Sequence, residues 1–140
     1  MASTYLQRTF SSGNQKTWTW SGWYKKCIND TQICLFNRNT SDNLYVVFRS
    51  DNKLELVNYV GGLQALLITN AQYRDPSAWY HFVASVDTTQ ATESDRIKLY
   101  LNGERITSFS SETYPAQNYD LAFNTADVHN IGVYLLTNPV

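Results

Sequence analysis

The sequence predicts an all-β domain, an antiparallel sandwich or barrel, and three observations support this. Aromatic residues make up 14% of the 140 residues, with 10 Tyr and 4 Trp, and such residues suit the pleated, half-buried surface of a sheet. Short runs of alternating apolar and polar residues recur at spacings of roughly 8–12 residues, with turn-forming clusters between them. No window has a helical period with caps, and Asp75-Pro76 interrupts the only candidate, residues 71–80.

The first predicted strand is Thr17–Lys25, which follows a turn cluster at 11–14. Its side chains alternate between two faces, one with Trp18, Trp20 and Tyr24 around Gly22, the other with Thr17, Thr19, Ser21 and Trp23. Further strands are predicted at 31–37, 44–49, 53–59 and 65–69. The polar loop 38–43, the turn 50–52 and the pair Gly61-Gly62 separate these strands.

The most regular predicted strand is Trp79–Asp87, which opens the second half of the chain. It places Tyr80, Phe82, Ala84 and Val86 on one face and His81, Val83 and Ser85 on the other. An exposed polar loop is predicted at 87–95, followed by a hairpin at 96–107. Asn102-Gly103 forms the hairpin turn, because a type I′ turn needs positive φ at both central residues. Segment 108–120, with Pro115, is predicted to be irregular, and weak strands at 121–123 and 128–134 follow.

Charge and composition exclude several classes of partner. The formal net charge is -1, so no basic field is present to hold a nucleic-acid backbone. No apolar run approaches the ~20 residues that a membrane-spanning helix needs. The first residues carry no basic region followed by an apolar stretch, so we expect synthesis in the cytoplasm without a secretion signal.

Two cysteines, Cys27 and Cys34, flank a predicted loop between two strands. Facing each other across a hairpin, they would be able to close a disulfide. The expected cytoplasmic origin favours free thiols instead. Two cysteines with no histidine nearby in the sequence do not make a zinc site.

Three of these strands together resemble a known family. The string TWTWSGWYK at Thr17–Lys25 resembles the opening strand of the laminin-G-like, concanavalin-A-like jelly rolls. WYHFVA at 79–84 resembles their central strand, and IKLYLNGE at 97–104 resembles their Asn-Gly hairpin. The resemblance implies an all-β, two-sheet antiparallel β-sandwich that occupies residues 1–140 as a single domain.

One form of this family is similar in further details. The long loop 87–95, Tyr114-Pro115 and His129-Asn130-Ile131-Gly132 resemble domains of tailed-phage and marine viral structural proteins. This implies a non-enzymatic virion module, such as a capsid decoration, fibre or tail component, made in the host cytoplasm and packed on other virion proteins. The alternative is an extracellular, lectin-like attachment domain that binds surface glycans.

The family usually continues past its Ile-Gly strand into a further strand that returns to the first sheet, and this sequence has no such strand. We therefore expect either a trimmed form of the domain or a strand supplied by a neighbouring chain. An uncovered apolar edge promotes aggregation, which favours a homo-oligomer or another strand-completing neighbour.

Catalysis is the third hypothesis, and the sequence argues against it. Related jelly-roll glucanases carry Glu-x-Asp-x-x-Glu on one strand, whose carboxylates act as nucleophile and acid/base. The nearest string begins at Glu93 and Asp95 and has Lys98 in place of the second glutamate. We therefore predict no enzyme activity and no catalytic residues, and we expect His81 and His129 to be structural.

No cofactor is predicted. Some laminin-G-like domains bind calcium at one rim, so the resemblance allows calcium here, but no spacing matches a dedicated calcium loop. No metal ligand is assigned. The carboxylates that a common rim would bring together are Asp75, Asp87, Asp95, Asp120 and Asp127.

Outward-facing aromatic and basic side chains are the remaining candidates for a binding site. Tyr and Trp rings stack on the apolar faces of sugars and are also enriched in protein interfaces. The alternation within each predicted strand turns five such residues away from the core. These glycan- or partner-binding candidates are Trp23, Tyr45, Arg49, Lys98 and Tyr100.

Overall fold

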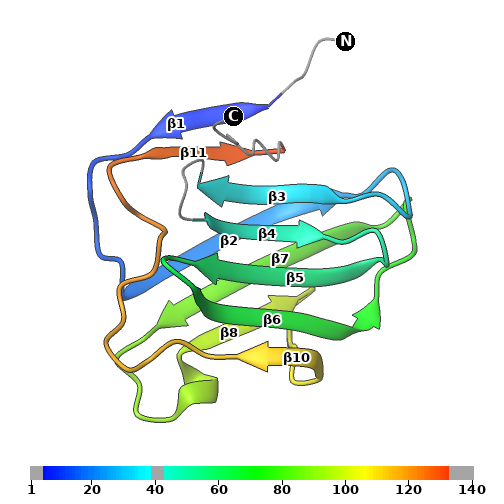
Figure 1. The fold of residues 1–140 in the computed structure, drawn as a ribbon. Helices are drawn as coiled ribbons and strands as arrows, with labels where there is room; N and C mark the ends of the chain where they lie inside the picture. Colours follow the sequence, from blue (N-terminus) through cyan, green and yellow to red (C-terminus); the bar gives the residue numbers. More distant parts are fainter. Residues whose placement is uncertain (1–4, 39–42, 133–140) are drawn as a thin grey trace.

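The computed structural model describes residues 5–38 and 43–132, which form two antiparallel sheets packed face to face (Figure 1). The larger sheet has the order β1-β11-β3-β4-β5-β6-β10 and the smaller sheet the order β2-β7-β8-β9. The larger sheet consists of β1 (Leu6–Thr9), β3 (Ile33–Arg38), β4 (Asn43–Phe48), β5 (Lys53–Tyr59), β6 (Leu63–Gln72), β10 (Phe109–Thr113) and β11 (Val128–Ile131). The smaller sheet consists of β2 (Thr17–Lys25), β7 (Trp79–Asp87), β8 (Ile97–Leu101) and β9 (Glu104–Arg105). The predicted all-β sandwich is confirmed.

Helical structure is minimal in this architecture. Across residues 5–38 and 43–132 the one helical element is a 3₁₀ turn, η1 (Glu93–Asp95), within the predicted polar loop. None of the described residues forms a helix with the length and apolar character needed to cross a bilayer.

The core lies between the sheets and follows from period-two alternation. Every second residue of β7 is buried, and Leu44, Val46 and Phe48 of β4 alternate in the same way to face the core. Trp20 of β2 stacks on Phe36 of β3, with 4.5 Å between ring centroids, and joins the two layers. A Cβ atom at Gly22 would lie 2.7 Å from the Trp20 ring, so glycine leaves room for Trp20 and Tyr24 to stack.

A register shift and a tight turn are two local features of this fold. The register of β3 against β4 shifts between Cys34 and Phe36, so Leu35 is an extra residue, and both Leu35 and Phe36 are buried in the core. The predicted hairpin turn is confirmed, because Asn102 has φ 51° and Gly103 has φ 85°.

The predicted elements differ from the structure at three places. β1 was not predicted, because all four of its side chains are exposed and show no alternation of burial. The segment 108–120, predicted to be irregular, contains β10, which pairs with the edge of β6. The predicted strand at 121–123 is wrong: Leu121 and Ala122 are buried in the core, and the Ala122 backbone donates to Asn58 Oδ1 instead of to a neighbouring strand. Residues 133–134 of the last predicted strand lie outside the described residues.

The loop between the two cysteines is not a hairpin. It crosses from β2 in the smaller sheet to β3 in the larger one, so Cys27 and Cys34 do not face each other across paired strands. Both are free, with Cys27 exposed and Cys34 buried. Burial raises the pKa of the Cys34 thiol to about 12.

A buried cation ties this crossover loop to the rest of the molecule. Lys26 is 3% exposed, and its ammonium donates to Asn29 Oδ1 and to the Tyr73 carbonyl, each at 3.1 Å, and also to Asn52 Oδ1. Asn52 in turn donates to Asp30 Oδ1 at 2.8 Å. One ammonium thus joins the β2–β3 loop, the β4–β5 turn and the segment that follows β6.

Replacing Lys26 by Met should lower the free energy of unfolding by about 2–4 kcal/mol, because one buried and two partly buried acceptors lose their donor. The measurement is urea unfolding followed by tryptophan fluorescence. Lys25→Met is the matched control, since Lys25 is exposed and its change should stay within about 0.5 kcal/mol. Equal effects of the two substitutions would show that the buried ammonium contributes nothing.

Candidate binding surface

The outward face of the smaller sheet carries an exposed aromatic cluster. In the ladder of β2 with β7, Trp23 lies opposite His81 and Lys25 lies opposite Trp79. Trp23 is 65% exposed and Trp79 is 58% exposed, which is unusual for two neighbouring indoles. We call the outward side chains Trp23, Trp79, His81, Val83 and Tyr100 the aromatic face.

His81 holds one of these indoles in place. The Trp23 and His81 rings are 4.8 Å apart between centroids, at an interplanar angle of 30°. The imidazole is positioned in turn by a 2.9 Å hydrogen bond between its Nε2 and Ser21 Oγ. Trp23 is therefore supported on one side and open to solvent on the other, which suits a flat ligand that stacks on it.

Charged side chains of both signs lie beside the aromatic face, among them Lys25, Asp87 and the group around Asp95. Asp95 Oδ1 lies 3.2 Å from Lys98 Nζ and 3.5 Å from Arg105 Nη2. At the end of β7, Asp87 accepts hydrogen bonds of 2.6 Å from both Thr89 Oγ1 and Gln90 Nε2, and these bonds, first that of Thr89, hold its pKa below the usual range. The surface offers polar groups without a strong field of either sign, which favours a neutral ligand.

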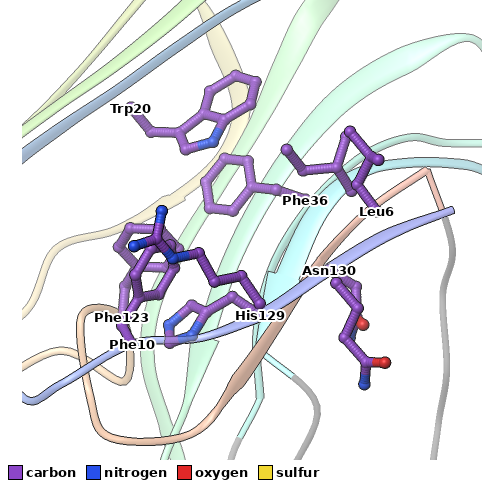
Figure 2. Close-up of a pocket in the computed structure, with 10 residues that line it drawn as sticks. Leu6, Phe10, Trp20, Phe36, Phe123, His129 and Asn130 are labelled. Carbon is purple, nitrogen blue, oxygen red and sulfur yellow. The ribbon is translucent and has the colours of Figure 1, made fainter.

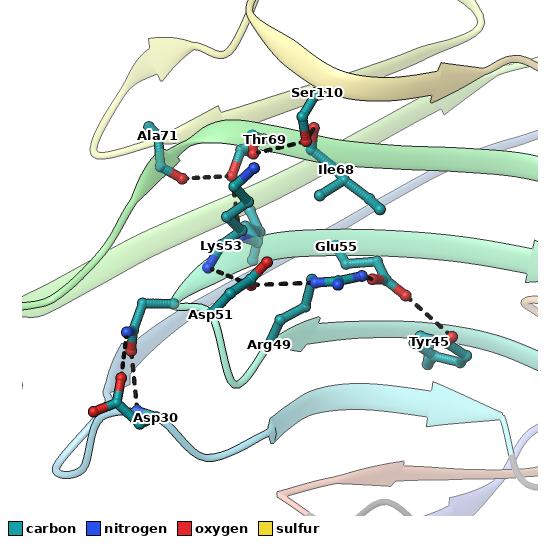
Figure 3. A network of polar contacts seen from close by, with 12 residues as sticks. Asp30, Tyr45, Arg49, Asp51, Lys53, Glu55, Ile68, Thr69, Ala71 and Ser110 are labelled. Carbon is teal, nitrogen blue, oxygen red and sulfur yellow. Dashed lines mark hydrogen bonds and ion pairs between the residues drawn. The ribbon is translucent and has the colours of Figure 1, made fainter.

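The five sequence candidates separate onto opposite sides of the sandwich. Trp23, Lys98 and Tyr100 lie together on the outward side of the smaller sheet. Tyr45 and Arg49 lie on the outward side of the larger sheet, where both bind Glu55 (Figure 3).

Glu55 organises that second location. It is 7% exposed, accepts a 3.1 Å hydrogen bond from Tyr45 Oη and pairs with the Arg49 guanidinium. Arg49 also pairs with Asp51 at 3.2 Å. Tyr45 and Arg49 therefore help to cover the larger sheet, and they form no common site with Trp23.

Three residues of the aromatic face, Trp79, His81 and Val83, were absent from the sequence candidates. Trp79 and His81 alternate with the core residues Tyr80 and Phe82, so the pattern of β7 already placed them outward. The missed signal was their cross-strand position beside Trp23, which depends on the pairing of β2 with β7.

Four of the five aspartates named for a calcium rim, Asp75, Asp87, Asp95 and Asp127, have separate partners. Asp75 accepts hydrogen bonds from Ser77 and Ala78, while Asp127 accepts them from Arg38 and Thr125. Asp87 and Asp95 bind the groups described above. The part of the chain that the structure describes contains no group of three or more His, Cys, Asp or Glu side chains that could hold a metal ion.

A second feature is an apolar groove beside β2, with a cavity of about 120 Å³ (Figure 2). β2 is an edge strand that packs over β3, so within residues 5–38 and 43–132 no strand of the smaller sheet covers β11 and β1 beyond it. Leu6 of β1 is 70% exposed as a result. The groove is lined by Leu6, Gln7, Arg8, Phe10, Trp20, Phe36, Phe123, His129, Asn130 and Ile131.

His129 closes one end of this groove. Its ring contacts Phe10 and Phe123 edge-on, at 4.9 and 4.8 Å between centroids, and its Nδ1 donates to the Asp127 carbonyl at 2.9 Å. Burial lowers the pKa of His129, so the imidazole is neutral at pH 7. This environment is that of a packed structural histidine, as expected.

Replacing Trp23 or Trp79 by Ala should change the free energy of unfolding by less than about 1 kcal/mol, because exposed side chains bury little area. Trp18→Ala, in the core, should cost about 3–5 kcal/mol. Urea unfolding followed by far-ultraviolet circular dichroism measures all three. A loss at Trp79 as large as that at Trp18 would show that the exposed indole serves folding.

Comparisons with known proteins agree on the architecture. Residues 2–132 match the model of a family described as "Concanavalin A-like lectin/glucanases superfamily". No curated protein matches the chain. Among solved structures, a native heptameric SAP-like pentraxin from Limulus polyphemus superposes with a TM-score of 0.57 at 15% identity. The match covers 91% of this chain but 56% of the pentraxin chain, and at this identity it concerns the fold alone.

Proposed function

Since the chain belongs to the concanavalin A-like lectin/glucanases superfamily, we propose that it is a non-enzymatic, lectin-like module that binds carbohydrate on its aromatic face. The observation that carries this proposal is the pair of neighbouring exposed indoles, Trp23 and Trp79. Large exposed apolar side chains that are gathered at one place mark interaction sites.

Carbohydrate suits the chemistry of this face. Pyranose rings have one apolar C–H face that stacks on indole, and their hydroxyl groups pair with polar side chains around the ring. Ser21 and His81 lie beside Trp23, while Tyr100 and Lys98 lie further along the same face. The surface is an open sheet rather than an enclosed pocket, so it suits a chain of sugars.

The carboxylates near this face do not support hydrolysis. A glycosidase needs two carboxyl groups that flank the scissile bond. Glu93 and Asp95 lie in η1, and Asp95 is already engaged by Lys98 and Arg105. Lys98, in place of the second glutamate, supplies no carboxyl group. Binding without catalysis is therefore the function that we propose.

A glycan array with the purified chain should show saturable binding, and Trp23→Ala or Trp79→Ala should weaken it at least about tenfold through loss of one stacking contact. Isothermal titration calorimetry gives the affinities. Tyr59→Ala is the matched control, because Tyr59 is an exposed aromatic residue on the larger sheet. Equal binding by the wild type and both tryptophan variants would refute the proposal.

A second candidate function is a structural module of a virus particle. It is supported by the sequence resemblance to viral structural proteins and by the groove beside β2. Neighbouring strands of a sheet lie about 4.8 Å apart, so the two uncovered strands β11 and β1 leave room above them for about two added strands. An extended segment of a neighbouring chain would complete the smaller sheet and bury Leu6. In this role the protein is located in the virion, and in the lectin role it acts outside the cell.

If this groove joins copies of the chain, light scattering should detect an oligomer, and Leu6→Lys should shift it to monomer because a charge in the contact is costly. Leu63→Lys is the control, since Leu63 is also exposed but lies away from the groove. A monodisperse wild-type monomer would exclude self-association. Presence of the chain in purified particles would then be the remaining test of the structural role.

A further inference from the structure

A second cavity lies at the opposite edge of the sandwich, where β9 ends the smaller sheet and β10 ends the larger one. Its volume is about 280 Å³. Ile97, Ile106 and Phe109 supply apolar walls, and Arg105, Glu112 and Tyr114 supply polar groups. We call this cavity the edge pocket.

The edge pocket results from the shortness of β9. This strand has two residues and pairs only with Tyr100 and Leu101 of β8. Beyond it, the Ile106 backbone donates to the Leu99 carbonyl at 2.8 Å, and the chain then passes to β10. In the part of the chain that the structure describes, no strand of the smaller sheet lies beside Ile97 on this side, which leaves the space that forms the pocket.

The polar groups of the edge pocket are both donors and acceptors. Tyr114 Oη donates to Glu112 Oε2 at 3.2 Å. Burial, with the neighbouring Glu112 carboxylate, raises the pKa of Tyr114 to about 12, so its hydroxyl stays protonated at neutral pH. Among the described residues Glu112 has no cationic partner, and Arg105 uses Nη2 alone, toward Ser94 and Asp95.

These groups match one class of ligand. A sugar ring has an apolar face for the walls, and its neighbouring hydroxyls both donate and accept hydrogen bonds. One hydroxyl can donate to Glu112 while the next accepts from the free N–H groups of Arg105, and hydrogen bonds to charged groups are the stronger kind. The pocket carries one cation and one anion, which favours a neutral sugar.

A row of cross-strand neighbours leads from the aromatic face to Arg105 of the edge pocket. Ser21 of β2 lies opposite Val83 of β7, Val83 lies opposite Tyr100 of β8, and Tyr100 lies opposite Arg105 of β9. This row crosses three strand spacings, about 14 Å in all, from the neighbourhood of Trp23 to the pocket. A single sugar does not cover that distance, whereas an oligosaccharide does.

We propose that the edge pocket binds one sugar residue of the neutral oligosaccharide whose other end stacks on Trp23 and Trp79. This inference rests on the proposed function and deepens it, because it identifies the ligand as a chain of several sugars. The aromatic face supplies stacking, and Arg105, Glu112 and Tyr114 supply hydrogen bonds that select the seated residue.

The test uses the full chain and a series of gluco-, manno-, xylo- and galacto-oligosaccharides, from mono- to hexasaccharide, measured by isothermal titration calorimetry. Affinity should rise at least tenfold with length once both locations are occupied. Glu112→Gln and Tyr114→Phe should each weaken hexasaccharide binding about fivefold to tenfold and leave disaccharide binding unchanged. Glu104→Gln is the control, because Glu104 is an exposed carboxylate on β9 that does not line the pocket.

The outcomes separate the two proposals. If Trp23→Ala weakens binding but Glu112→Gln and Tyr114→Phe do not, and affinity is independent of length, the edge pocket proposal is overturned and the lectin-like function stands. If no oligosaccharide in the series binds, the edge pocket proposal is overturned; if Trp23→Ala and Trp79→Ala both bind as the wild type does, both proposals fail. Thermal unfolding of each variant verifies that it is folded.

Discussion

Packing of Trp20 on Phe36 sets the position of the smaller sheet over the larger one. Gly22 makes this contact sterically possible, because any larger residue at that position would press on the Trp20 ring. Once β2 is fixed over β3 in this way, the alternation along β2 determines the direction in which its other side chains point. Residues next to the buried ones must face solvent, and Trp23 is among them.

The unequal width of the two sheets then determines where the molecule is open. Seven strands face four, so the smaller sheet covers only part of the larger one. At one edge this leaves an apolar groove beside Leu6, and at the other edge the two-residue β9 leaves a pocket beside Ile97. Both concavities therefore arise from one architectural property, while their chemistry differs: the first is apolar and the second has charged groups at its rim.

These surfaces suit different tasks. The groove and the free edge of β2 suit an extended polypeptide, because an edge strand offers unpaired backbone groups along its length. The aromatic face and the edge pocket suit carbohydrate, because the exposed indoles offer stacking surfaces and the pocket offers a pair of opposite charges, and a cross-strand row leads from one to the other. A particle component that also attaches to glycans would use both surfaces without conflict, since they lie at different places on the sandwich.

The sequence by itself determined the strands whose alternation is strong, the Asn102-Gly103 turn and the outward direction of Trp23, because these properties depend on residues close together in the chain. It did not predict β1 or β10, whose polar residues become strands only through pairing with β11 and β6. Only the tertiary structure decided which outward residues share a surface. Trp23 meets His81 through strand pairing across 58 residues of chain. Tyr45, in contrast, points to the opposite side of the sandwich. Both outcomes depend on cross-strand partners and on the order of strands, which are set by contacts between distant residues and not by any local pattern.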